Sequence, residues 1–255
     1  YILCPDELQL PIEVYEIVPK KPIVIITWQG TKPELPSILL NSHMDVVPVY
    51  ENQWTHPPFA AEIDDKGWIF ARGTQDMKTI GIQHIEAVRK LKNSNATLTR
   101  TVHLCGDDGM KIFVKSPEFM NLNVGLALDE SMPNPEDFII AFYGERTTWR
   151  DNVCTCYHYI LIYRSDKCSA TVVATVCGYI INYLTFHSGV KVDFRVCPGG
   201  TDSRYIREQN IAAFGFSPLM STPILLHAHD ERVHVDTYLR GIEVFEKVIP
   251  AIANA

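Results

Sequence analysis

The sequence has no cluster of basic residues and is short of positive charge overall. Its 23 Lys and Arg residues are outnumbered by 30 Asp and Glu residues, which gives a net charge of −7. Nucleic-acid-binding proteins usually present a basic face, so this balance argues against a polyanionic partner. A long apolar run is also lacking, because the longest, at residues 170–184, is interrupted by Thr, Gly and Asn. A membrane span needs roughly 20 apolar residues, so we predict a buried helix there and no membrane insertion.

Cysteine is scarce and irregularly spaced. The count is seven, an odd number that leaves at least one thiol unpaired or bound to another molecule. Residues 1–5 form neither a basic leader nor an extended apolar core, so we expect no signal peptide. These features favour a reducing compartment, and we predict a cytoplasmic protein.

Composition and periodicity predict an α/β protein. The chain is 46% hydrophobic and 21% charged, which is typical of a globular domain with a large core. Apolar or alternating runs predict strands at residues 12–18, 22–28, 37–41, 101–104, 124–128, 138–142 and 211–216. Apolar residues at helical spacing predict helices over residues 76–92 and from residue 235 to near the C-terminus. Strands that alternate with helices indicate a mostly parallel sheet flanked by helices. We expect one domain over residues 1–255, with an irregular segment at about 150–197.

Polar residues follow one strand in a pattern suited to metal binding. The apolar run at residues 37–41 leads into His43 and Asp45. Ligands in α/β proteins gather at the carboxyl ends of strands, where a neutral imidazole can bind a metal and a carboxylate can orient the ring. The alternative is that the pair only caps the end of a strand.

Three further segments repeat this chemistry. Asp76 follows Gly73 where a helix begins, so it either bridges two metal ions or serves as an ordinary N-cap. Asp129 and Glu130 end another apolar strand, and the segment at residues 227–231 holds two histidines and two acids. The glycine turn at residues 199–204 opens into a polar helix start that can bind an anion. Four sites of this kind in one chain predict a metal centre.

These motifs together resemble one protein family. They read Ser-His-Met-Asp-Val-Val-Pro (42–48), Trp-Thr-His-Pro-Pro-Phe (54–59), Ala-Arg-Gly-Thr-Gln-Asp-Met-Lys (71–78), Ala-Leu-Asp-Glu (127–130) and His-Ala-His-Asp-Glu-Arg (227–232). The chain resembles the cytosolic aminoacylases, N-acyl-L-amino-acid amidohydrolases of the zinc exopeptidase superfamily that includes carboxypeptidase G. The resemblance is continuous over residues 23–149 and again from residue 199 to the C-terminus.

The resemblance implies a site for up to two zinc ions. By the family's pattern His43, Asp76 and Glu130 bind one zinc, and His227 binds the second, with Asp76 as the bridge. The remaining assignments that it implies are Asp45 as the acid that orients His43, with Thr201, Asp202 and Arg204 lining the substrate site. His229 and His234 match no family ligand, so we interpret them as supporting or surface residues.

The chain departs from the family after the strand at residues 101–104. The family has an Asp-Glu-Glu-x-Gly-Gly segment there, whose first glutamate is the general base and whose second binds zinc. This chain instead has Asp107 and Asp108 in a shorter segment. We assign Asp107 as the base and Asp108 as a metal ligand, although aspartate is one methylene shorter. By chemistry alone, His103 and Cys105 are alternative ligands.

The second departure concerns the family's lid domain. Relatives insert a lid that dimerises and supplies a histidine in a Gly-x-Pro-Gly-His motif. Fewer than fifty residues connect Trp149 to Cys197, and neither His158 nor His187 lies in that motif. The chain is therefore either a reduced form or part of a longer protein. Without the lid, a monomer is the default expectation.

The resemblance implies zinc-dependent hydrolysis of N-acyl-L-amino acids to a free amino acid and a carboxylate, with a small molecule as substrate. A non-catalytic relative that keeps the fold and the ligands is one alternative. A zinc dipeptidase of the same superfamily is the other.

Overall fold

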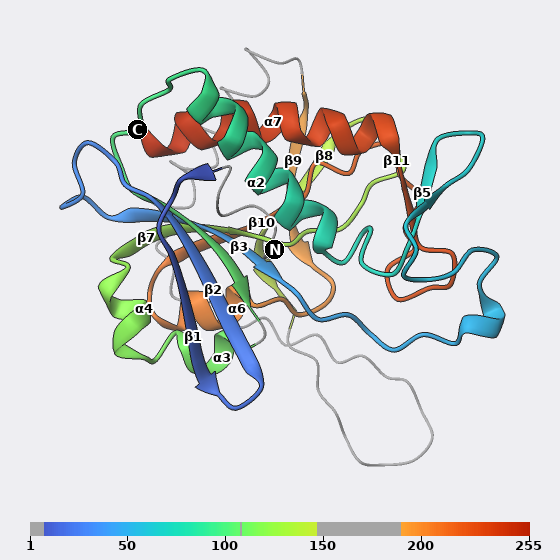
Figure 1. Cartoon of the computed structure of the whole chain (residues 1–255), viewed down its shortest axis with the longest axis horizontal. Helices are drawn as coiled ribbons and strands as arrows, with labels where there is room; N and C mark the ends of the chain where they lie inside the picture. Colours follow the sequence, from blue (N-terminus) through green and yellow to red (C-terminus); the bar gives the residue numbers. More distant parts are fainter. Residues whose placement is uncertain (1–7, 108, 147–189) are drawn as a thin grey trace.

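A mixed, mostly parallel sheet forms the centre of the computed structural model, which describes residues 8–107, 109–146 and 190–255 (Figure 1). Its strands are β1 (Ile12–Val18), β2 (Lys21–Trp28), β3 (Ser37–His43), β6 (Val102–Asp107), β7 (Val124–Asp129), β8 (Ile139–Glu145), β9 (Val192–Cys197) and β10 (Ala212–Phe216). Their order is β1-β2-β6-β3-β7-β10-β8-β9, and the four central strands β6, β3, β7 and β10 run parallel. The predicted fold class is confirmed.

Helices cover both faces of this sheet. The long helices α2 (Lys78–Asn93) and α7 (Val235–Ala253) pack together over one face, drawn in teal and red in Figure 1. The short helices α3 (Met110–Phe113), α4 (Pro117–Asn121) and α6 (Ser203–Glu208) lie on the other face. The result is a three-layer arrangement with one hydrophobic core on each side of the sheet.

Strand β3 shows how the sequence produces two cores. Successive side chains of a strand point to opposite faces, so Ile38 and Leu40 enter the core under α2 and α7, while Leu39 enters the other. All three side chains are buried. A near-continuous apolar run is expected for a central parallel strand that is covered on both faces. This burial fixes the strand and delivers His43 to its carboxyl end.

A second, three-stranded sheet joins two distant parts of the sequence. It consists of β4 (Glu62–Ile63), β5 (Trp68–Phe70) and β11 (Arg232–His234), in the order β11-β5-β4. A short 3-10 helix (Glu51–Gln53) precedes β4 in the chain. These strands span two or three residues, too few for the periodicity that predicted the longer ones. Pairing of β11 with β5 brings the segment at residues 227–231 beside the turn at residues 71–76.

Part of the expected organisation lies outside the described residues. This holds for the buried helix predicted at residues 170–184 and for most of the irregular segment at 150–197. The described end of that segment forms β9, which pairs in parallel with β8. Among the described helices, none has the length and apolar character needed to cross a membrane.

Candidate metal centre

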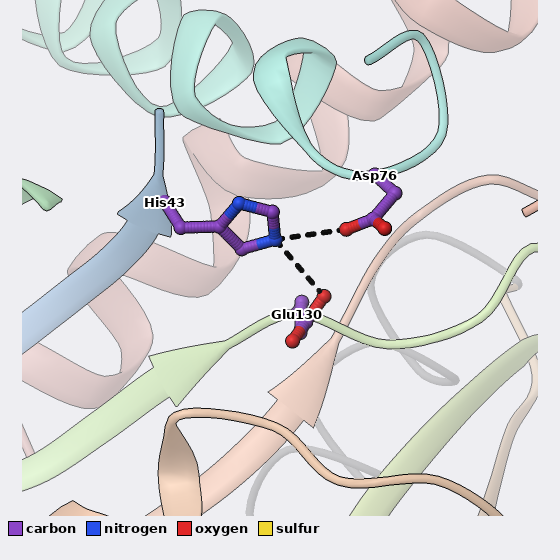
Figure 2. Close-up of side chains that lie close together, drawn as sticks. All are labelled: His43, Asp76 and Glu130. Atoms are coloured by element: carbon purple, nitrogen blue, oxygen red, sulfur yellow. Dashed lines mark hydrogen bonds and ion pairs between the residues drawn. The ribbon is translucent and has the colours of Figure 1, made fainter. Parts of the chain in front are cut away.

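His43 lies at the carboxyl end of β3, and Figure 2 shows its ring pointing toward Asp76 and Glu130. Its Nε2 lies 2.8 Å from Oδ1 of Asp76 and 3.4 Å from Oε2 of Glu130. On the other side, Nδ1 lies 3.4 Å from a carboxylate oxygen of Asp45 and 3.1 Å from its carbonyl oxygen. The structure therefore brings together four of the residues predicted from the sequence.

Asp76 lies between two imidazoles. Its Oδ1 faces His43, and its Oδ2 lies 2.8 Å from Nε2 of His227. Helix α2 begins at Lys78 with Met77 at its N-cap and no side-chain cap, so Asp76 does not have the N-cap role considered as its alternative. The side chain of His227 is 62% exposed, so this half of the centre is open to solvent.

The protonation of this cluster follows from burial and charge. Burial alone would lower the pKa of His43, but hydrogen bonds to Asp45, Asp76 and Glu130 raise it above its usual range. Burial also opposes ionisation of Asp76, yet hydrogen bonds with His43 and other neighbours lower the pKa of Asp76 to about 2. Burial raises the pKa of Glu130 to about 8. The cluster is built to favour a positive charge at its centre.

The donor set fits a divalent metal ion. Ligand atoms of His43, Asp76 and Glu130 all lie within 4.8 Å of one another. One ring nitrogen carries at most one proton, and here it faces two carboxylates. A metal ion placed between the three groups would satisfy all of them. One imidazole nitrogen with two carboxylate oxygens is a ligand combination that zinc accepts.

A buried hydrogen-bond network holds the end of β7 in place. Asp129 is 1% exposed, and its Oδ1 accepts a hydrogen bond of 3.0 Å from Nδ2 of Asn41 on β3. Its Oδ2 accepts hydrogen bonds of 2.7 Å from both the backbone N–H and the hydroxyl of Ser203 on α6. Asp129 thus joins three elements and fixes the backbone from which Glu130 extends.

The structure describes only the backbone of the predicted base, Asp107, and does not describe the predicted metal ligand Asp108. Asp107 ends β6, and its backbone pairs with that of His43 in the parallel ladder. The side chain of Asp107 and all of Asp108 lie outside the described residues, so both roles stay predictions. His103, one of the alternative ligands, instead bonds Thr27 and the carbonyl of Leu122. The other alternative, Cys105, is buried in the core under α3 and α4.

A cavity of about 810 Å³ opens over the cluster. His43, Asp76, Glu130 and His227 line one part of it, and Asp45 lines it as well. The cavity is also lined by Thr201, Asp202 and Arg204, the three residues predicted to contact substrate. Lys111 and Cys197 also line the cavity. Sequence reasoning missed these two, because nothing in the local pattern marks either residue.

The turn predicted to bind an anion is already paired with acids of this chain. The N–H of Thr201 donates to Glu145 at 2.5 Å, and the N–H of Ser203 donates to Asp129. Arg204 pairs with the same Glu145 at 3.2 Å, and its side chain is 35% exposed. The backbone at this turn therefore offers less to an external anion than the sequence suggested. The Arg204 side chain is the positive group of this turn that lines the cavity.

The two extra histidines play structural parts. His229 makes edge contacts with the rings of Tyr50 and Trp54, at centroid distances of 6.3 and 6.4 Å. His234 is the N-cap of α7, where Nδ1 accepts from the N–H of Asp236. Neither belongs to the cluster of His43, Asp76 and Glu130 among the described residues.

Sequence comparison finds one family and a set of close relatives. The profile of peptidase family M20/M25/M40 matches residues 39–107 and 157–251. Aminoacylase-1 of Mus musculus is 32% identical, with 97% of this chain and 88% of the relative covered. Aminoacylase-1 of Homo sapiens is 31% identical with the same coverage, and that of Dictyostelium discoideum is 29% identical. The mouse alignment spans 357 positions, more than the 255 residues of this chain, so part of the relative has no counterpart here.

Structural comparison supports the fold. An M20 family metallo-carboxypeptidase, Sso-CP2 from Sulfolobus solfataricus, superimposes with a TM-score of 0.71 at 12% identity, with 97% of this chain and 91% of that chain covered. The aminopeptidase PepT from Bacillus cereus gives a TM-score of 0.66 at 15% identity, with 99% and 92% covered. At such low identity the likeness concerns architecture alone.

Proposed function

Because the chain belongs to peptidase family M20/M25/M40 and is a metal-dependent amidohydrolase, we propose that it hydrolyses N-acyl-L-amino acids with zinc. The observation that carries the proposal is the convergence of His43, Asp76 and Glu130 below one cavity. Similarity to aminoacylase-1 over 97% of the chain supports the choice of substrate.

In this proposal His43, Asp76 and Glu130 hold one zinc ion, and Asp76 with His227 and Asp108 holds a second. Zinc supplies Lewis acidity for the amide carbonyl and lowers the pKa of water towards about 7. Asp45 keeps the His43 ring oriented, because it contacts the nitrogen opposite the one that faces the cluster.

Proton transfer is proposed for Asp107. The accepting atom of a general base has to lie within about 2.6–3.2 Å of the atom that carries the proton, directly or through one water. The backbone of Asp107 pairs with that of His43 in the parallel ladder, at the edge of the sheet where the cluster lies. Asp107 would take a proton from water and return it to the leaving amine.

The carboxylate of the substrate is proposed to bind beside the positively charged Arg and Lys side chains of the cavity. Arg204 and Lys111 are the positive side chains among the described residues that line it. Glu145 already balances part of the charge of Arg204, so we expect moderate rather than tight binding of the carboxylate. Thr201 and Asp202 line the same cavity. Burial, with the nearby charge of Asp129, raises the pKa of Asp202 to about 7.

Removal of metal should abolish turnover. Protein treated with a chelator is expected to lose hydrolysis of N-acetylmethionine and to regain it on addition of zinc. The assay is release of free methionine, with a dipeptide tested in parallel. Cleavage of the dipeptide alone would contradict the proposed substrate and favour a dipeptidase. A zinc-loaded protein that hydrolyses neither compound would favour a non-catalytic relative.

Gly200 offers a test of the role of Arg204. A Cβ atom at Gly200 would collide with the Arg204 guanidinium, whereas a Cβ at Gly199 meets nothing within 4 Å. Gly200→Ala should therefore displace Arg204 while the fold persists, because the far end of a long side chain can move. We expect KM for N-acetylmethionine to rise about tenfold, the effect of roughly 1.4 kcal/mol, with a smaller change in kcat.

Gly199→Ala is the matched control for this substitution, and it should leave both constants near the wild-type values. An unchanged KM in Gly200→Ala would contradict the assignment of Arg204 to substrate binding.

We also propose a single catalytic domain that acts as a monomer in the cytoplasm. No dimerising lid is evident from the sequence, and among the described residues one central sheet carries packed helices on both faces. A dimer mass in light scattering would contradict the monomer.

A further inference from the structure

Glu231 is a fully buried carboxylate with no assigned role. It lies four residues after His227 and directly before β11, and its side chain is 0% exposed. Its Oε2 accepts a hydrogen bond of 2.5 Å from Nη1 of Arg72, whose side chain is 2% exposed. A buried ion pair generally contributes little net stability, so it invites a search for another role.

The second oxygen of Glu231 organises the turn that carries Asp76. Its Oε1 accepts backbone hydrogen bonds from Gly73 at 3.1 Å, from Gln75 at 2.6 Å and from Asp76 at 3.2 Å. Three N–H groups of one short turn thus converge on a single oxygen that water does not reach. This sets the backbone at the residue whose carboxylate faces both imidazoles.

The same turn is tied to the segment that carries His227. Nη2 of Arg72 donates to the carbonyl of His227 at 3.4 Å. The Gln75 amide donates to the carbonyl of Pro223 and accepts from the N–H of Leu225, both at 2.9 Å. Arg72, Gln75 and Glu231 therefore fix the position of the turn that carries Asp76 relative to the segment that carries His227.

We propose that Glu231, together with Arg72, is a positioning residue for the metal centre, which fixes Asp76 relative to His227. This rests on the proposed function, since it requires that the cluster binds zinc. Glu231 lies too deep to touch substrate, so it acts through Asp76. Side chains that orient metal ligands in this way typically change metal affinity 10- to 100-fold when they are replaced.

The test is zinc affinity of Glu231→Gln, measured by competition with a chromophoric chelator. Glutamine keeps the size of Glu231 and an oxygen for the three N–H groups, but its amide opposes the Arg72 donor. We expect zinc affinity to fall 10- to 100-fold. Gln83→Ala is the control, because Gln83 is buried on α2 and bonds the carbonyl of Tyr238, away from the cluster. It should lower the melting temperature of the metal-free protein and leave zinc affinity unchanged.

A second variant covers the case in which Glu231→Gln does not fold. The double variant Arg72→Met with Glu231→Gln removes both charges and leaves neither one unpaired. It also loses the bond to the His227 carbonyl, so zinc affinity should again fall at least tenfold. Wild-type zinc affinity in either folded variant would overturn the positioning role. Failure of the wild-type protein to bind zinc would overturn the proposed function, and this inference with it.

Discussion

Replacement of Asp76 by Asn should abolish hydrolysis of N-acetylmethionine. Each oxygen of Asp76 lies 2.8 Å from a histidine nitrogen, so one carboxylate serves both halves of the cluster. Asparagine supplies one neutral oxygen, and its NH₂ group is a donor that cannot bind a metal ion. Metal-assisted charge stabilisation contributes several kcal/mol to catalysis, which corresponds to a loss of at least ~10³-fold in kcat/KM. Steady-state kinetics and a zinc titration together measure the effect.

The control for Asp76→Asn is Asp236→Asn, which makes the same chemical change on a side chain that is 86% exposed. Asp236 lies in the first turn of α7, away from the cluster, so turnover and zinc affinity should stay at the wild-type level. Circular dichroism of the metal-free proteins would show whether both variants are folded. Full turnover by folded Asp76→Asn would contradict the proposed centre.

The proximity of His43 and Glu130 could be predicted because each lies at the end of a predicted strand. His43 and Glu130 each lie at the end of an apolar run that is typical of a strand buried on both faces, and parallel strands present their carboxyl ends on one edge. Proximity of the two residues therefore follows from local pattern and fold class. Seven of the eight strands of the central sheet and the two long helices were predicted from apolar runs or periodicity, whereas β9 lies in the segment expected to be irregular.

Contacts that depend on tertiary packing were not predictable. Asp230 and Glu231 are neighbours in a polar segment, yet Asp230 bonds the exposed N–H of Thr55 while Glu231 is buried against Arg72. The burial of Glu231 follows from the pairing of β5 with β11, strands too short to leave a periodic signal. Likewise, the helix start at Ser203 looked free to bind an anion, because its partner Asp129 is 74 residues away in the sequence.

We expect the free energy of unfolding to depend on pH through His84. It lies on α2, fully buried, with its ring edge-on to Phe245 of α7 at a centroid distance of 4.4 Å. Its Nε2 finds no hydrogen-bond partner among the described residues. Burial lowers the pKa of His84 to about 3, so the folded protein keeps this ring neutral at pH values where the unfolded chain takes up a proton.

The sign of this effect is set by the two pKa values. Above the unfolded pKa of about 6.5 the ring is neutral in both states, and His84 contributes no pH dependence. As the pH falls from 6.5 towards 3, only the unfolded state binds the proton, so the free energy of unfolding decreases. The slope approaches about 1.4 kcal/mol per pH unit, which amounts to about 2 kcal/mol by pH 5.

His84→Leu should remove this acid sensitivity, because leucine is apolar and has nearly the same volume. At pH 7.5 the free energy of unfolding should change by less than about 1.5 kcal/mol, while at pH 5 the variant should gain about 2 kcal/mol relative to the wild type. Urea unfolding of the metal-free proteins between pH 7.5 and 4 measures this difference.

His103→Leu is the contrasting variant, since it leaves the hydroxyl of Thr27 and the carbonyl of Leu122 without their hydrogen-bond partner. That loss should destabilise the fold by about 1–3 kcal/mol even at pH 7.5. Parallel pH profiles for the wild type and His84→Leu would mean that His84 is already protonated, or open to water, in the folded protein.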